Sequence, residues 1–180
     1  MSSDDSTPSE LANVALRHVA YNHNDWAGFK WGHLSGITIG QGLLINRYDS
    51  GMGGSTEFNS NKAGFLGYAD WDDYSVDVLY TGTNVKAARI GVILPYFMLL
   101  DTPFELGFTG AEDSDGIDET VNNVAINRNK ADGYAVDLTL PIGGDFLTFY
   151  TEFAKVTNHG DGATLGLKGN IMNQFSYRLG

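Results

Sequence analysis

The chain has 180 residues, of which 42% are hydrophobic and 23 are glycine, and its formal net charge is −11. This charge argues against nucleic acid as a partner, because phosphate binding needs clustered lysine and arginine, and the chain has 11 of the two together. The absence of cysteine excludes disulfides, thiolate metal ligands and cysteine nucleophiles. The longest apolar stretch, residues 90–100, is about half as long as a membrane-spanning helix and contains Pro95. Abundant glycine and aromatic residues favour short strands over helices.

Residues 1–31 form an N-terminal segment whose pattern differs from that of residues 32–180. Thr7-Pro8-Ser9-Glu10 has the form of a capping box with proline at the first helical position. We expect a short helix over residues 8–20 or, alternatively, an extra strand, because the apolar residues that follow fit both patterns. The first residues lack the positive and apolar regions of a signal peptide. This is expected for a chain whose signal peptide has been removed, for an internal piece of a longer chain, or for a protein that is not exported.

From residue 34 onward the hydrophobic pattern has a period of two. Tyr74, Val76, Val78 and Tyr80, for example, alternate with Ser75, Asp77 and Leu79. Such alternation indicates strands with one apolar and one polar face. The sequence therefore predicts an all-β fold, an antiparallel up-and-down meander of about nine or ten strands. The nine strands predicted directly are 34–45, 63–71, 74–81, 87–95, 103–111, 132–142, 145–156, 163–171 and 174–179.

The connections between these strands differ in length in an ordered way. Residues 46–62 and 112–131 form long connections, whereas 72–73 and 143–144 form tight turns. Long and short connections that alternate along the chain collect at opposite ends of a meander, as they do in outer-membrane barrels. The meander is thus expected to be part or all of a transmembrane β-barrel. A soluble sandwich of two sheets would show the same alternation of side chains and stays open as an alternative.

Several segments resemble strands of porin-like outer-membrane β-barrels of diderm bacteria. The segments are Gly32-His-Leu-Ser-Gly-Ile-Thr-Ile-Gly-Gln-Gly-Leu-Leu-Ile-Asn-Arg-Tyr48, Ala88-Arg-Ile-Gly-Val-Ile-Leu-Pro95, Phe104-Glu-Leu-Gly-Phe-Thr-Gly110, Tyr134-Ala-Val-Asp-Leu-Thr-Leu-Pro141, Phe149-Tyr-Thr-Glu-Phe-Ala-Lys155 and His159-Gly-Asp-Gly-Ala-Thr-Leu-Gly-Leu-Lys168. The resemblance covers roughly residues 30–180 and rests on pattern. It implies a location in the bacterial outer membrane, contact with membrane lipid, and passage of small solutes or ions. Such barrels usually finish on a strand with an aromatic end and have an even number of strands, whereas this chain finishes on Arg178-Leu179-Gly180 and has an odd number of predicted strands. These departures suggest an internal segment of a larger barrel. A closed ten-strand barrel that uses residues 12–31 as a strand is the alternative.

The ionisable residues within the predicted strands lie mostly on the face opposite the aromatic residues. In a barrel this face lines the lumen, and in a sandwich it is the solvated surface. The chain is therefore expected to be a passive pore or a structural barrel with a mildly acidic lumen. The predicted pore-lining residues are Asp77, Arg89, Glu105, Asp137, Glu152, Lys168 and Arg178. Aromatic residues near strand ends are expected to form the girdles of such a barrel, namely Trp26, Trp31, Trp71, Tyr48, Tyr68, Tyr96 and Tyr150.

Residues 112–119 gather five carboxylates around a glycine, which is how calcium loops collect oxygen ligands. The predicted ligands are Asp113, Asp115, Asp118 and Glu119. The spacing of an EF-hand is absent, so a solvated acidic loop is the alternative. The histidines lack metal-binding spacing, and no dinucleotide, Walker or GxSxG motif is present.

Accordingly, we expect no enzymatic activity and no cofactor other than this possible calcium ion. The second class of function that the sequence allows is a secreted or cell-surface β-sandwich that binds carbohydrate or calcium, as an adhesin or a self-assembling subunit. The sequence indicates no oligomeric state.

Overall fold

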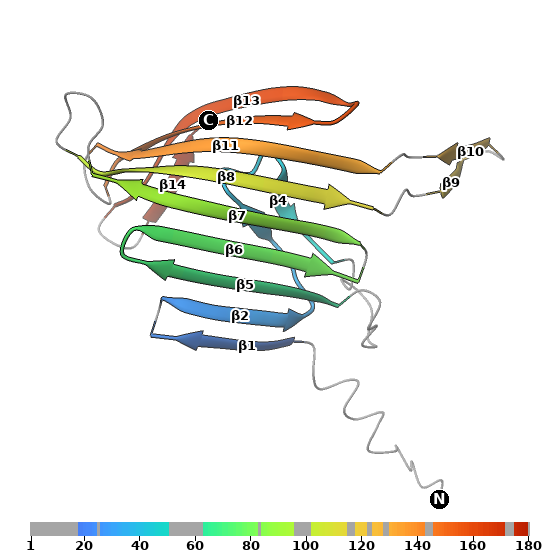
Figure 1. The fold of residues 1–180 in the computed structure, drawn as a ribbon, viewed down its shortest axis with the longest axis horizontal. Helices are drawn as coiled ribbons and strands as arrows, with labels where there is room; N and C mark the ends of the chain where they lie inside the picture. The colour runs from blue at the N-terminus through green and yellow to red at the C-terminus, as the bar shows by residue number, and fades with distance from the viewer. Residues whose placement is uncertain are drawn as a thin grey trace, which may run out of the picture.

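The computed structural model describes residues 18–24, 26–50, 63–82, 84–95, 102–114, 118–121, 124–127, 130–142, 146–171 and 175–179. Within these ranges ten strands form one antiparallel sheet in the order β1-β2-β5-β6-β7-β8-β11-β12-β13-β14 (Figure 1). The strands are β1 (His18–His23), β2 (Ala27–Gly32), β5 (Gly64–Trp71), β6 (Tyr74–Thr81), β7 (Val85–Leu94), β8 (Phe104–Asp113), β11 (Ala131–Pro141), β12 (Thr148–Val156), β13 (Gly160–Ile171) and β14 (Phe175–Leu179). The described residues contain no helix of the length and hydrophobicity needed to cross a membrane.

The predicted all-β meander is confirmed, and its first strands lie earlier in the chain than expected. From β5 to β14 the strands coincide with eight of the predicted ones, and each pairs with its neighbour in sequence along the sheet. Residues 18–32 add the antiparallel pair β1–β2, with His18 opposite Gly32. Of the two alternatives for residues 8–20, a helix or an extra strand, residues 18–20 form a strand, and residues 8–17 lie outside the described residues.

The single strand predicted over 34–45 is not part of the large sheet, and only Ile37–Ile39 and Ile45 of this range are in strands. Residues 33–50, here called the inner hairpin, leave the sheet and contain the short strands β3 (Ile37–Ile39) and β4 (Ile45–Tyr48), which pair with each other. Gly36, Gly40 and Gly42 have φ angles of +69°, +63° and +93°, a backbone region that glycine adopts without strain. The chain reverses here instead of extending. Leu34 and Ser50 join the base of the inner hairpin, since the Ser50 N–H donates to the Leu34 carbonyl over 2.8 Å.

The long connections lie at one end of the sheet. In an up-and-down meander, 33–63 and 114–130 both connect strands at the same end, which we call the loop end; the opposite end, with the 72–73 turn, is the turn end. The predicted segregation holds only in part, because the short 82–84 and 157–159 connections also lie at the loop end. The connection predicted over 112–131 is shorter than expected, and it contains the hairpin β9 (Asp118–Val121) and β10 (Val124–Asn127), which projects beyond the sheet (Figure 1).

The sheet curls around the inner hairpin. Figure 1 shows β14 and the inner hairpin behind the strands at the front of the view. A small apolar core joins the hairpin to the wall, with Leu34, Ile39 and Ile45 packing on Leu79 and Ala87. We call the face that contacts the hairpin the inner face and the opposite one the outer face. In the described part of the chain, β1 and β14 are the two edge strands of the sheet and do not pair with each other. No second sheet of the described residues covers the outer face.

Candidate functional site

Arg89 is the centre of a charge cluster on the inner face. Its Nε and Nη2 atoms donate to the two carboxylate oxygens of Asp137 over 3.1 and 2.8 Å, and its Nη1 lies 2.9 Å from Glu105 Oε1. Ser75 completes the group, because its Oγ accepts from Arg89 and donates to Glu105 over 2.9 Å. The side chain of Asp137 is 0% exposed and that of Arg89 7%, so the pair is shielded from water. Hydrogen bonds of this charge-assisted, bidentate kind are the strongest that side chains make.

Two glycines make space for this guanidinium. Gly91 and Gly107 lie opposite each other on β7 and β8 with their missing side chains on the inner face. A Cβ atom at Gly107 would overlap Asp137 and Arg89, and one at Gly91 would overlap Glu105 and Ser75. The glycines therefore let the charged side chains lie flat on the sheet.

The tip of the inner hairpin is fastened to the far strands of the curled wall by polar contacts. The Gln41 amide donates to Thr139 Oγ1 over 3.0 Å and accepts from Lys168 Nζ over 3.3 Å, while the Gln41 carbonyl accepts from Arg178. The Leu43 N–H donates to Glu152 Oε2 over 2.8 Å. One hairpin thus contacts β11, β12, β13 and β14, which holds the curvature of the sheet.

Tyr150 supports the two basic residues of this contact. It is 2% exposed, its hydroxyl accepts from Arg178 Nε over 3.0 Å, and the Arg178 guanidinium lies 4.5 Å from the ring centre. Lys168 Nζ lies 5.8 Å from the same ring centre. Such cation–π contacts stabilise a positive charge more when water is excluded.

The structure places all the residues predicted to line a pore on the inner face, as the strand register requires. Arg89, Asp137 and Glu105 are in direct contact, and Asp77 is the register partner of Arg89 on the neighbouring strand. The other three reach the same region through the inner hairpin, namely Glu152, Lys168 and Arg178.

Of the six described aromatic residues predicted for girdles, three do not lie on the outer face. Tyr48 is in the inner hairpin, Tyr68 donates from the inner side to Asn22, Tyr150 is buried, and Tyr96 lies outside the described residues. The three tryptophans do point outward. Trp26 and Trp71, at the turn end, have ring centres 6.4 Å apart, whereas Trp31 lies near the loop end.

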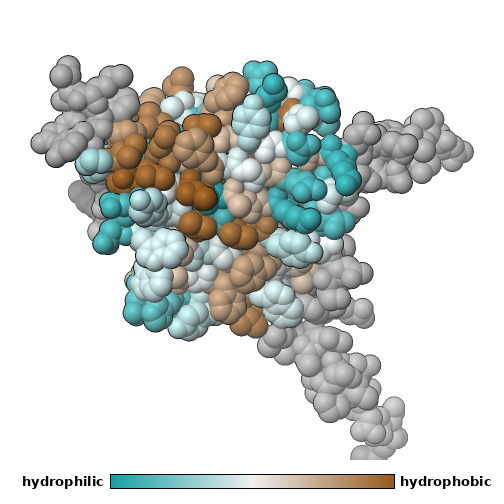
Figure 2. Space-filling view, in the orientation of Figure 1, coloured by the Kyte–Doolittle hydropathy of each residue, from teal (hydrophilic) through white to brown (hydrophobic). Residues whose placement is uncertain are grey.

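The outer face is apolar and exposed along its length. Ile90, Phe108 and Leu165 are 53%, 50% and 68% exposed, far above what an apolar side chain in a soluble core shows. Aromatic rings continue across the strands, with Phe29 and Phe65 centred 6.1 Å apart. Figure 2 shows apolar residues gathered over β7, β8 and β11 toward the turn end and hydrophilic residues toward the loop end.

Charged residues of the outer face form one row, which we call the charged collar. Its members are each the second residue from the loop end of their strand, namely Lys86, Glu112, Asp132, Lys155 and Asp161. Register pairs connect Lys86 to Glu112, Glu112 to Asp132, and Lys155 to Asp161. Between the charged collar and the turn end, the outward positions of these five strands carry no Asp, Glu, Lys or Arg. An apolar band therefore ends abruptly at a charged border.

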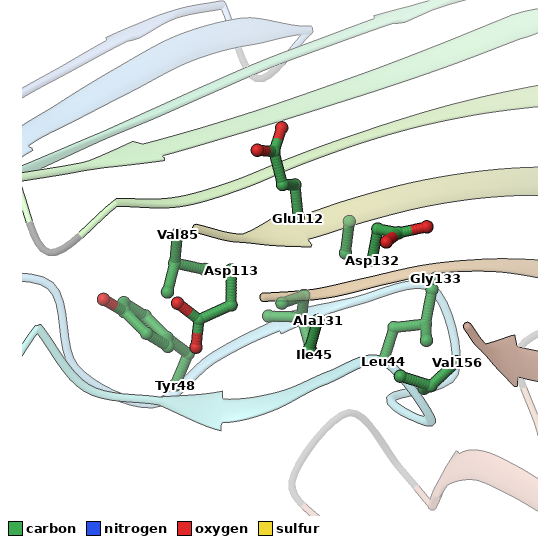
Figure 3. Close-up of a pocket in the computed structure, with 11 residues that line it drawn as sticks. Leu44, Ile45, Tyr48, Val85, Glu112, Asp113, Ala131, Asp132, Gly133 and Val156 are labelled. Atoms are coloured by element: carbon green, nitrogen blue, oxygen red, sulfur yellow. The ribbon is translucent and has the colours of Figure 1, made fainter. Parts of the chain in front are cut away.

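A pocket of about 290 Å³ lies at the loop end between the inner hairpin and the wall (Figure 3). Leu44, Ile45 and Val156 form part of its apolar lining. Asp113 is directed toward Tyr48, whereas Glu112 points away from the hairpin. The sequence did not predict this pocket, because it depends on the hairpin folding inward.

The calcium prediction remains a prediction. Asp113 lies on the inner side of β8, Asp115 is outside the described residues, and the side chains of Asp118 and Glu119 are likewise undescribed. Among the described side chains no group of three or more His, Asp or Glu residues is arranged to hold a metal ion.

Gln41 and Gly107 were not predicted as site residues, and Tyr150 was predicted for a girdle and not for the inner face. Gln41 has one signal in the sequence, because its two glycine neighbours mark a sharp reversal that presents a polar side chain. Gly107 has another, since it lies two residues from an inward acid on a strand that is otherwise rich in large side chains. Tyr150 has none, because its partners come from distant strands. Comparison of the chain with protein-family models, curated proteins and solved structures returns no match.

Proposed function

We propose that this chain forms the wall of a β-barrel in the bacterial outer membrane, with the outer face in lipid and the inner face toward the lumen. The observation that carries the proposal is the exposed outer face, whose outward positions on β7, β8, β11, β12 and β13 are uncharged from the turn end to the charged collar and, apart from Thr151, apolar or glycine. Large exposed apolar surfaces are rare on soluble monomers, and a lipid-facing barrel wall is one of the few structures that need one.

The dimensions of the apolar band fit a membrane. The outward residues of β11 from Tyr134 to Leu140, and Ile142 directly after the strand, are apolar. They span about 26 Å along the strand at a rise of about 3.3 Å per residue, or about 20 Å across a bilayer at a tilt of about 40°. Barrels of this type carry an apolar band about 25 Å tall, with aromatic or charged residues at its borders. Trp26, Trp71 and Tyr74 would form one border, and the charged collar the other.

This assignment also orients the chain. Long loops of outer-membrane barrels lie outside the cell and short turns lie in the periplasm. We therefore infer that the loop end, with the connections 33–63 and 114–130, faces outward. An open sheet edge cannot face lipid, because its N–H and C=O groups would lack hydrogen-bond partners. The wall is completed either by pairing of β1 with β14, which run antiparallel, or by further strands.

The inner hairpin restricts what passes. It lies against Arg89's side of the sheet and contacts strands as far apart as β6 and β14. A lumen that holds this hairpin, and in which Arg89 is already paired with Asp137 and Glu105, favours a structural barrel or a narrow passive pore over a wide channel. The alternative, a secreted sandwich that binds carbohydrate or calcium, needs a second layer over the outer face, and the described residues supply none.

The proposal is tested by refolding the protein into phosphatidylcholine vesicles and, in parallel, in buffer without detergent. We expect folding in vesicles only. A charge placed in the lipid should oppose folding, so Ile90→Arg is expected to destabilise the vesicle-bound protein by about 2–4 kcal/mol. Lys86→Arg is the matched control on the same strand, four residues away in the charged collar, and should change stability by less than about 0.5 kcal/mol.

Two results would contradict the proposal. One is a folded, monodisperse protein in detergent-free buffer that does not bind vesicles. The other is an Ile90→Arg protein as stable in vesicles as the unmodified chain.

A further inference from the structure

Three oxygen atoms converge beneath the tip of the inner hairpin. A Cβ atom built on Gly40 would lie 3.0 Å from Glu152 Oε1, 3.3 Å from Thr109 Oγ1 and 3.4 Å from Asp137 Oδ2. The three side chains come from the neighbouring strands β12, β8 and β11. The missing side chain of Gly40 thus opens a small space that is bounded by two carboxylates and one hydroxyl.

Two of these oxygens are buried without a hydrogen-bond partner among the described residues. They are Glu152 Oε1 and Thr109 Oγ1, on residues that are 1% and 2% exposed. The other Glu152 oxygen accepts from the Leu43 N–H, and Asp137 Oδ2 accepts from Arg89 Nε. The Gln41 N–H also faces the Glu152 carboxylate, without forming a hydrogen bond to Oε1. Because buried polar atoms in folded proteins are almost always satisfied, these two oxygens indicate a bound species.

The surrounding charge selects the kind of species. Asp137 is already paired with Arg89, whereas Glu152 has no ion-pair partner among the described residues. The three oxygens are therefore left with the single negative charge of Glu152. One monovalent cation balances this charge. A calcium ion would bring a second positive charge and would need six to eight oxygen ligands, more than converge here.

We propose that Glu152, Thr109 and Asp137 bind one small monovalent cation of the sodium class beneath Gly40. The ion satisfies the two unpartnered oxygens and joins three strands of the wall directly under the tip of the inner hairpin. The inference does not depend on the membrane proposal, because the site lies on the inner face and needs no lipid.

The site is tested by thermal unfolding of the full chain in detergent micelles, in sodium chloride and in N-methyl-D-glucamine chloride at the same ionic strength. Equal ionic strength removes general screening as a cause of any difference. At a sodium concentration about tenfold above the dissociation constant, we expect sodium to raise the unfolding midpoint by about 3–5 °C. Glu152→Gln and Thr109→Val should abolish this increment.

Thr139→Val is the matched control. Thr139 also points to the inner face, but its hydroxyl is occupied by Gln41, so this variant should keep the sodium increment even if its midpoint is lower. Equal midpoints of the unmodified protein in the two salts would overturn the proposal and leave water as the occupant. A larger increment with calcium chloride than with sodium chloride would overturn the monovalent assignment. Failure to bind vesicles with the increment intact would contradict only the membrane proposal.

Discussion

Replacement of Arg89 by methionine should show whether the lumen is dry at its centre. Arg89 makes two hydrogen bonds to Asp137 and an ion pair of 2.9 Å with Glu105. Methionine keeps much of the length of the side chain and removes its charge. Because Asp137 is fully buried, Arg89→Met leaves its carboxylate shielded from water and without its two hydrogen bonds from the guanidinium.

The expected cost is large. Removal of one partner from a buried ion pair typically destabilises a protein by about 3–5 kcal/mol, because the remaining charge is uncompensated. Removal of both charges together should cost less than the two single changes added, so Arg89→Met with Asp137→Leu should recover part of the loss. Lys86→Met, in the exposed charged collar, is the control and should change stability by less than about 0.5 kcal/mol.

The assay is urea unfolding of the vesicle-bound protein, followed by the fluorescence of its three tryptophans. A loss below about 1 kcal/mol for Arg89→Met would refute the reasoning, since it would mean that water reaches Asp137. Full additivity of the double variant would also contradict a direct, buried pair.

Three further changes test other parts of the structure. Gly107→Ala should destabilise the protein by about 1–3 kcal/mol in the same urea assay, because the added Cβ overlaps Asp137 and Arg89. Gly110→Ala on the same strand is the control and should be nearly neutral, since a Cβ there has no atom within 4 Å. Equal losses of stability in the two variants would refute the close approach at Gly107. Gln41→Ala removes the contacts of the hairpin tip with Thr139 and Lys168, so it should raise the single-channel conductance in planar bilayers. An unchanged conductance would mean that the hairpin tip does not restrict passage. The acidic loop should give the pore a cation preference that fades as salt is added, given a Debye length of about 8 Å at physiological ionic strength. Changing Asp113, Asp115, Asp118 and Glu119 to Asn or Gln should weaken this preference. Identical reversal potentials of the variant and the unmodified protein in planar bilayers would exclude the loop as its source.

The strand pattern was predictable from sequence because alternation reports which face is buried. Once β5 to β14 pair in register, Asp77, Glu105 and Lys168 must share a face, and Tyr74 and Phe108 must share the other. A period of two does not say what covers each face. The exposed outer face and the occupied inner face are properties of the three-dimensional arrangement.

The inner hairpin escaped prediction because its local pattern imitates a strand. Ile37, Thr38 and Ile39 alternate apolar and polar side chains, and residues 43–45 are an apolar run, so both ends fit a strand. The positive φ angles at Gly40 and Gly42, between them, turn the chain back. Gln41 bonds to Thr139, and Leu43 bonds to Glu152; in each pair the two residues are about a hundred positions apart in the chain. No local spacing in the sequence could therefore predict these contacts. The charge cluster was predicted as a set of pore-lining residues, but its pairing through Arg89 needed the register of four strands.

The most direct test of the lipid-facing wall uses the absence of cysteine. Single cysteines at Phe108, Thr109 and Glu112 on β8 can each carry a nitroxide spin label in vesicle-bound protein. Collisions with oxygen, which concentrates in lipid, and with a water-soluble nickel chelate then report the surroundings of each position. We predict high oxygen access at Phe108→Cys, low access to both reagents at Thr109→Cys, and nickel access at Glu112→Cys. Nickel access at Phe108→Cys equal to that at Glu112→Cys would contradict the membrane wall.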